Sequence, residues 1–96
     1  MSSAYIIANV TVTNTAQYEE YKKWSSAAMQ VHGAQVCTRG GKVDVLEGDW
    51  HPDRVVILKF PGLDAAHTFY NSPEYGKARA VRQGAAVMRM VVVEGV

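Results

Sequence analysis

The stretch Arg54-Val55-Val56-Ile57-Leu58-Lys59-Phe60 decides the fold, because its β-branched and aromatic residues make it the clearest β-strand in the sequence. Successive side chains of a strand point to opposite faces of a sheet. Val56 and Leu58 therefore face one way, and Val55 and Ile57 face the other. Both faces of this strand are apolar, so we expect both to be covered.

The stretch Val87-Met88-Arg89-Met90-Val91-Val92-Val93 shows the same pattern near the other end of the sequence. Met88 and Met90 face one side and Val87 and Val91 face the other, so both sides of this strand are mainly apolar. If helices covered only one face, the other would expose an apolar patch larger than the few hundred square ångströms that monomers tolerate. We therefore expect a second copy of the chain to pack sheet against sheet about a two-fold axis, forming a homodimer.

The first third of the sequence predicts a strand followed by a helix. Residues 5–12 are rich in β-branched and aromatic side chains, which favour a strand. Thr13 or Asn14 then caps a helix, and Gly33 ends it. The apolar stripe of this helix comprises Tyr18, Tyr21, Trp24, Ala28 and Val31.

The middle of the sequence leaves two alternatives open. A second strand covers residues 35–38, Gly40-Gly41 interrupts it, and residues 43–46 resume an extended pattern. The glycines permit either a tight hairpin or one strand with a bulge. Residues 48–53 then form a turn before the strand quoted first.

Two helices are expected before the last strand, the first over about residues 64–71. Ser72-Pro73-Glu74 begins the second, because serine caps a helix, proline suits its first position and an acid suits its first turn. This helix ends at Gly84. The order is β-α-β-β-α-β with the second helical region split. It predicts an α+β, ferredoxin-like plait over residues 1–96, a single domain with an antiparallel sheet and helices on one face.

The composition excludes several classes of protein. The apolar content of 48% and the charged content of 20% are typical of a globular domain, and the formal net charge of +1 offers no surface for nucleic acid. Cys37 is the only cysteine, which favours a reducing, cytoplasmic location. The N-terminal residues resemble neither a signal peptide nor a membrane span. The histidine spacings match no zinc motif and no nucleotide-binding fingerprint occurs, so no metal or cofactor is expected.

Residues 39–54 combine two arginines, several acids, Trp50 and a histidine with glycines and a proline. Together with its flanks, this stretch resembles the domain-of-unknown-function 1330 family of the dimeric α/β-barrel superfamily. The matching segments are Ile7-Ala8-Asn9-Val10-Thr11-Val12-Thr13, Tyr18-Glu19-Glu20-Tyr21, Arg39-Gly40-Gly41, Val45-Leu46-Glu47-Gly48-Asp49-Trp50, Pro52-Asp53-Arg54-Val55-Val56, Ser72-Pro73-Glu74-Tyr75 and Val93-Glu94-Gly95.

The resemblance implies a ferredoxin-like subunit and a dimer formed by sheet packing, and it implies no established reaction. The wider superfamily includes cofactor-free monooxygenases and small isomerases, which bind substrates between sheet and helices. The chain departs from the family pattern after Tyr75. Many members carry further basic residues there, whereas Arg79 and Arg82 are followed by Gln83-Gly84.

Five residues are candidates for ligand binding in a pocket between sheet and helices. They are Asn9, Arg39, Tyr70, Tyr75 and Arg54. Arg39 precedes two glycines and could hold a carboxylate; alternatively, it pairs with Glu47 or Asp49 across the loop. Asn9 lies in mid-strand, where its amide needs partners. Tyr70 and Tyr75 flank the break between two helices, and Trp50 is expected to lie over the core or the dimer seam.

Two hypotheses for function follow from the sequence. The first is a homodimer that binds a small molecule. If the homodimer is catalytic, it is an enzyme that needs no cofactor. Its reaction would be oxygenase-like or isomerase-like, on a small organic acid or aromatic. Asn9 and Arg39 would then hold anionic or carbonyl oxygens, and a histidine or tyrosine would move the proton. The alternative is a non-catalytic dimerisation or assembly module without a small-molecule substrate.

Overall fold

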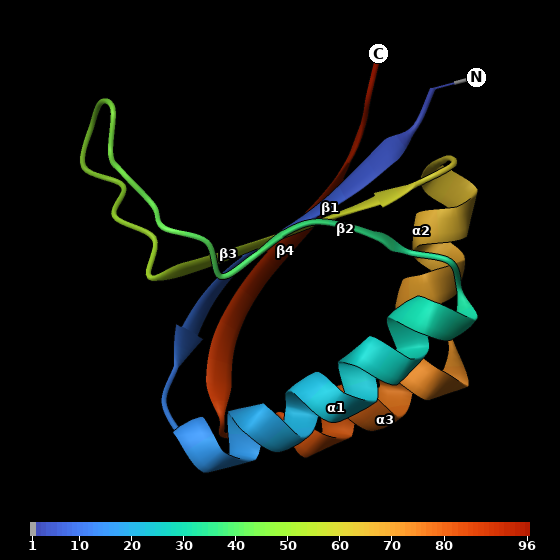
Figure 1. The fold of residues 1–96 in the computed structure, drawn as a ribbon, viewed down its shortest axis with the longest axis horizontal. Coiled ribbons are helices and arrows are strands. Elements are labelled where there is room, and N and C mark those ends of the chain that lie inside the picture. Colours follow the sequence, from blue (N-terminus) through green and yellow to red (C-terminus); the bar gives the residue numbers. More distant parts are fainter. Residues whose placement is uncertain (1) are drawn as a thin grey trace.

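The structure is a computed structural model, and it describes residues 2–96. Four strands and three helices follow one another in the order that the sequence predicts (Figure 1). They are β1 (Ala4–Val12), α1 (Thr15–Val31), β2 (Gln35–Arg39), β3 (Arg54–Phe60), α2 (Leu63–Tyr70), α3 (Pro73–Val81) and β4 (Ala86–Glu94). The strand order across the sheet is β2-β3-β1-β4, and all neighbours are antiparallel. This is the predicted α+β fold, with the topology of a ferredoxin-like plait.

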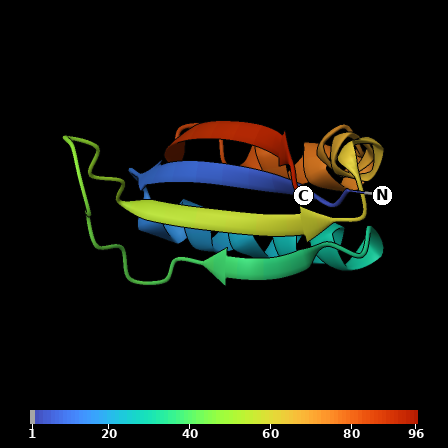
Figure 2. The same cartoon turned by 90° about the horizontal axis from the view of Figure 1, so that it is seen from above.

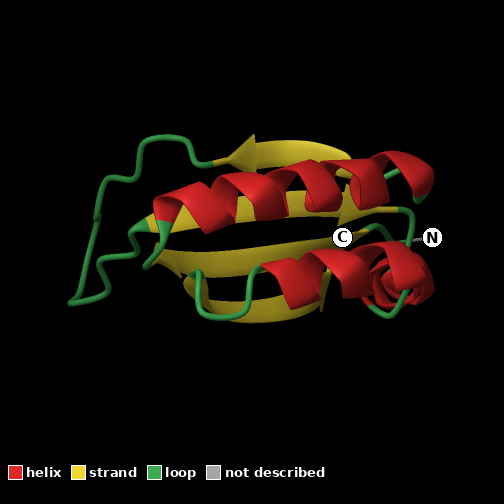
Figure 3. Cartoon of the chain, turned by 90° about the horizontal axis from the view of Figure 1, so that it is seen from below, coloured by secondary structure: helices red, strands yellow, loops and turns green. Residues whose placement is uncertain are grey.

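All three helices cover the same face of the sheet (Figure 3), and Figure 2 shows the opposite face, which no helix within residues 2–96 covers. The strands β1 and β3 alternate between buried and partly exposed residues as their period of two requires. Their buried rows supply the floor of the core, including Ile6, Val10, Leu58 and Phe60. The predicted division of β3 and β4 into two apolar rows is therefore confirmed.

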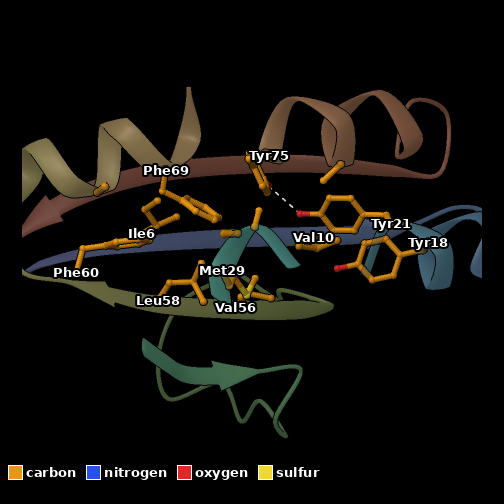
Figure 4. Packing of buried hydrophobic residues seen from close by; sticks show 14 of the residues in the cluster. Ile6, Val10, Tyr18, Tyr21, Met29, Val56, Leu58, Phe60, Phe69 and Tyr75 are labelled. Carbon is orange, nitrogen blue, oxygen red and sulfur yellow. Dashed lines mark hydrogen bonds between the residues drawn. The ribbon is translucent and has the colours of Figure 1, made fainter. Parts of the chain in front are cut away.

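Aromatic side chains from the helices fill the space above that floor (Figure 4). The Phe69 ring lies 5.2 Å from the Phe60 ring and 4.7 Å from the Tyr75 ring, measured between centroids. On α1, Tyr18 and Tyr21 continue this aromatic layer. Burial of rings at these separations makes this layer the main stabilising contact between helices and sheet.

The first turn of α1 is capped as predicted, by Asn14, whose side-chain oxygen accepts from the backbone N–H of Gln17 at 3.0 Å. Gln17 does not complete a reciprocal capping box. Its amide instead donates to the carbonyl oxygens of Val81 and Gln83, at 2.8 and 2.6 Å. This side chain therefore ties the start of α1 to the end of α3.

The predicted apolar stripe of α1 is only partly correct. Tyr18, Tyr21 and Ala28 are buried, but Trp24 is 41% exposed and Ser25 is fully buried in its place. A step of seven residues separates Tyr18 from Ser25, which is close to two helical turns, whereas Trp24 lies about 100° further round. The hydroxyl of Ser25 is buried at low cost because it is hydrogen-bonded. The helix then ends as expected at Gly33, with a φ of 66°.

Residues 40–53 form one irregular loop that projects past the end of the sheet (Figure 1). The expected extended segment at residues 43–46 is wrong, since β2 ends at Arg39 and its only irregularity is a register shift between Val36 and Thr38. Neither alternative for Gly40-Gly41 is therefore observed, and the register shift at Cys37 was not predicted. Trp50 is 63% exposed, so it does not cover the core of its own subunit. The β-branched pattern of residues 43–46 has no neighbouring strand to pair with.

The break between α2 and α3 follows the predicted capping pattern. The Ser72 hydroxyl accepts from the Tyr75 backbone N–H at 3.1 Å and donates to the Phe69 carbonyl oxygen at 2.7 Å. At the end of α1, His32 hydrogen-bonds the Glu74 carboxylate at 2.8 Å, and this bond lowers the pKa of that carboxyl. The start of α3 is thereby held to the end of α1.

The face without helices is mostly apolar. The pairing of the strands shows where its polar residues lie. Ile7 lies between Ile57 and Val91, whereas Asn9 lies between Val55 and Arg89. Lys59 lies at the other end, beside Tyr5. The valines of β4 on this face are among the most exposed apolar residues of the chain. The polar residues therefore do not converge into one cluster on this face.

The two ends of the sheet strands meet at one corner. The Gly95 backbone N–H donates to the Ser3 carbonyl oxygen at 2.7 Å. A side chain at position 95 would collide with the Tyr5 ring, since its Cβ would lie 2.8 Å from a ring carbon. Glycine therefore allows β1 and β4 to stay adjacent up to their ends.

Candidate functional site

A cluster of tyrosines and an arginine lies between α1, α3 and the sheet. The hydroxyls of Tyr21 and Tyr75 are 2.7 Å apart (Figure 4), and Arg82 Nη1 donates to the Tyr75 hydroxyl at 3.0 Å. The Arg82 guanidinium also lies over both rings, at 5.7 Å from Tyr21 and 5.9 Å from Tyr75. Both tyrosine hydroxyls and Arg82 Nη1 thus have partners supplied by the chain.

Burial favours the protonated form of the Tyr75 hydroxyl. It raises the pKa of Tyr75 well above the ordinary value, and the adjacent Tyr21 adds to the effect. Burial also raises the pKa of Tyr18, against the opposing effect of Arg54. The cavity enclosed by these side chains has a volume of about 20 Å³, which holds no more than a water molecule. This part of the predicted pocket is therefore filled by protein.

The Arg39 side chain links β2 to α1 through hydrogen bonds. Its Nη1 donates to the Ser26 hydroxyl at 2.8 Å, and its Nη2 donates to the Ser25 hydroxyl at 3.0 Å and the Lys22 carbonyl oxygen at 3.2 Å. The predicted pairing of Arg39 with Glu47 or Asp49 is not observed in residues 2–96. Those acids lie in the exposed loop, whereas the hydroxyls of α1 face the end of β2.

Arg54 is also engaged within the chain. Its guanidinium lies 5.5 Å from the centroid of the Tyr18 ring. The backbone of Gly40 lies so close to this guanidinium that any side chain at position 40 would collide with it. Gly40 has a φ of 81°, which glycine adopts without strain. Here the glycine allows the close approach of the Arg54 guanidinium.

Asn9 lies on the face of the sheet opposite to the helices, so the structure does not bring it together with the other four candidates. Its side-chain oxygen is buried and has no hydrogen-bond partner among residues 2–96. A buried acceptor without a partner costs free energy, which makes this position one that a second molecule on that face could satisfy. Of the five candidates, Tyr75 is enclosed in the core, and Tyr70 borders an apolar pocket. Arg39 and Arg54 line a separate, open hollow of about 310 Å³ whose other lining residues are charged or polar.

An apolar pocket of about 290 Å³ opens between α2 and the edge strand β4. Its lining includes Ile6, Ala66, His67, Tyr70, Met90 and Val92. Ala66 and His67 project toward the same side of α2 as Tyr70 because they precede it by four and three positions. Ile6, Met90 and Val92 belong to the helix-covered row of β1 and β4, and Val91 of the opposite row also lines the pocket at the edge strand. Two polar side chains, His67 and Tyr70, are thus placed at the rim of an otherwise apolar hollow.

The sequence analysis found Tyr70 but missed the rest of this pocket. His67 was identified only as a histidine unsuited to a zinc motif. The spacing of Ala66, His67 and Tyr70 would have shown that a small residue and two polar ones share one side of α2. Within residues 2–96, no group of three or more His, Cys, Asp or Glu side chains is placed to hold a metal ion.

A family model covers residues 3–96, nearly the whole sequence. The chain belongs to the family called domain of unknown function 1330. Among curated proteins, none matches the sequence. The resemblance seen in the sequence is therefore confirmed, and membership in this family brings no established reaction.

Solved structures resemble this member of the 1330 family in fold. A protein of unknown function from Rhodopseudomonas palustris is 23% identical, with a TM-score of 0.77 over 99% of this chain and 83% of that one. A dimeric ferredoxin-like protein of unknown function from Thermobifida fusca is 15% identical, with a TM-score of 0.65 over 97% and 91% of the two chains. SnoaB, a cofactor-independent oxygenase from Streptomyces nogalater, is 12% identical, with a TM-score of 0.62 over 97% and 92%.

These neighbours bear on the fold alone, because their identities are low. They are consistent with the ferredoxin-like topology described above, and one of them is described as dimeric. Within the part of the chain that the structure describes, no helix is both long and apolar enough to cross a membrane.

Proposed function

We propose that the chain forms a homodimer through the helix-free faces of two sheets, and that each subunit binds a small organic molecule in the pocket between α2 and β4. The observation that carries the binding part is the pocket itself. Its volume lies near the lower end of the range for ligand sites, and its lining is apolar with two polar groups at the rim. Such a site suits an aromatic or branched molecule of about ten non-hydrogen atoms.

As an enzyme, the protein would catalyse a reaction that needs no cofactor. His67 is the exposed imidazole at the rim and would take a proton from the bound molecule, while the Tyr70 hydroxyl would hold a carbonyl or phenolic oxygen. Loss of a proton from an activated carbon is the first step of both isomerisation and cofactor-free oxygenation. The fold shared with an oxygenase supports this class by analogy only.

The alternative function is an assembly module without a ligand. Two observations favour it: Arg39 is hydrogen-bonded to α1 and Arg54 lies over the Tyr18 ring, and the helix-free face and the loop at residues 40–53 expose apolar side chains. In that case the pocket beside α2 would be an ordinary surface hollow. A binding experiment separates the two alternatives.

The test uses methyl-labelled protein titrated with indole, 3-phenylpropanoate and 3-phenylpropanamide. We expect saturable NMR shifts of the Ile6 and Met90 methyl groups, with a Kd in the millimolar range or below for at least one probe. The variant Val92→Phe fills the pocket and should abolish the shifts, whereas Val31→Phe, on an exposed part of α1, should not. Absence of saturable shifts with all probes would contradict small-molecule binding.

A further inference from the structure

We propose that the ligand is an amphipathic carboxylic acid, whose carboxylate binds Arg79 and Arg82 in a polar cleft adjoining the apolar pocket. The inference rests on the proposed function, because it assigns a ligand class to the same site. The cleft has a volume of about 370 Å³, and its lining includes Tyr70, Arg79, Arg82, Gln83 and Met88. It is lined mainly by polar groups, in contrast to the neighbouring pocket.

The two arginines of the cleft are not neutralised by the chain. None of the ion pairs formed within residues 2–96 includes Arg79 or Arg82. Arg82 donates through Nη1 only, to the Tyr75 hydroxyl and to the Met88 sulfur, so its other nitrogens are available. Arg79 donates no hydrogen bond to a described residue, and its Nε is buried without a partner. Two guanidinium groups in this state form a site for a planar anion.

Tyr70 fixes the position of Arg79. The Arg79 guanidinium lies 4.7 Å from the centroid of the Tyr70 ring, which is a stacking contact. The Tyr70 ring in turn lies 5.6 Å from the ring of the buried Tyr75. The arginine is therefore held by an aromatic pair anchored in the core, and less side-chain entropy is lost when it binds an anion.

The end of α3 at this cleft would ordinarily repel an anion, because the last carbonyl groups of a helix carry partial negative charge. Gln17 removes much of this obstacle. Its amide donates to the carbonyl oxygens of Val81 and Gln83. The free carbonyl groups are thereby capped from the side of α1, and the two arginines dominate the local charge.

The cleft and the pocket lie side by side along β4, and they share Tyr70 as a wall. Met88 lines the cleft, and Met90 lines the pocket. Two residues of a strand on the same face lie about 7 Å apart. A ligand that occupies both hollows thus carries its acid group about 7 Å from the centre of its apolar body, as 3-phenylpropanoate does to within an ångström or two.

The test compares 3-phenylpropanoate with its neutral amide by calorimetry at constant ionic strength. We expect the acid to bind at least about 10-fold more tightly, since hydrogen bonds to a charged acceptor are the stronger ones. The variant Arg79→Gln should remove this preference without changing the affinity for the amide. The matched control Lys77→Gln removes the same charge from an exposed position of the same helix and should preserve the preference.

The outcomes distinguish this inference from the proposed function. Equal affinity for acid and amide, or an acid affinity unchanged by Arg79→Gln, would overturn the assignment of the carboxylate and leave the pocket as a binding site. An equal loss in Lys77→Gln would also overturn it, by showing that net charge alone is responsible. Binding of neither probe would refute the proposed function and this inference together.

Discussion

On the helix-covered face of the sheet, Leu58 is 2% exposed, whereas on the opposite face Val91 is 61% exposed. The two residues belong to the same sheet, and both are branched aliphatic side chains. They differ in what lies above them, since the helices contribute an aromatic layer to one face and nothing to the other. The comparison shows that apolar content alone does not tell which face a chain covers by itself. The proposed homodimer would cover the face without helices.

The largest difference between the faces should appear in the stability of the subunit. The substitution Phe60→Ala removes a fully buried ring that contacts Phe69. We expect it to lower the free energy of unfolding by about 3–5 kcal/mol, measured by urea denaturation. Lys59→Ala, one residue away on the other face, should change it by less than about 1 kcal/mol. A similar loss of unfolding free energy in both variants would show that the two faces do not differ in their contribution to stability.

A second prediction concerns association through the helix-free face. Val91→Asp places a carboxylate within the proposed interface, where its desolvation is unfavourable. We expect the dimer dissociation constant to rise about 100-fold, which corresponds to about 2.7 kcal/mol, as measured by analytical ultracentrifugation. Val31→Asp is the control, because Val31 is exposed to a similar extent, 65% against 61%, but lies on α1. A wild-type chain that is monomeric at high concentration would contradict the proposed dimer.

A smaller effect is expected from the polar cluster beneath the helices. Tyr75→Phe leaves the Tyr21 hydroxyl and Arg82 Nη1 without one partner each, which should cost roughly 1–3 kcal/mol. The cost should depend on pH. Because burial raises the pKa of Tyr75, its contribution to stability is fully present below the unfolded value near 10 and is lost as the pH rises above it.

The measurement for this variant is a series of denaturation curves between neutral pH and about pH 11. The wild-type protein should lose stability more steeply above pH 10 than Tyr75→Phe does. Tyr5→Phe, on the helix-free face, is the control for an ordinary tyrosine of the sheet. An identical alkaline dependence in wild type and Tyr75→Phe would show that this hydroxyl is not held in its protonated form by the fold.

The sequence predicted the fold well because the deciding signals are local. Alternation in β3 and β4 defines the two faces, and Asn14, Gly33 and Ser72 mark helix ends through their own backbone bonding. The predictions are wrong where the local structure depends on residues that are distant in the sequence. Residues 43–46 have strand-like composition but no strand beside them, and Ser25 is buried because Arg39 reaches it from β2.

The candidate site was harder to predict for the same reason. Asn9 and Arg39 are polar residues in apolar surroundings, a property that ligand contacts and structural braces share. The structure separates them, because they lie on different faces of the sheet. The pocket beside α2 depends on the distance between a helix and an edge strand, which no periodicity encodes. Of the five predicted residues, only Tyr70 lines the pocket proposed from the structure.

The hydrogen bond between Gly95 and Ser3 has a consequence for engineering. Because β1 and β4 meet at one corner, segments fused before Ser3 and after Gly95 would leave the molecule from the same place and lie close together. A short linker between these positions would make a circular chain, and the exposed loop at residues 41–51 offers a point at which to reopen it. Such a permuted chain would begin and end far from the pocket lining, with all four strands intact. New termini there would allow probes to be attached without occupying the corner where Ser3 and Gly95 meet.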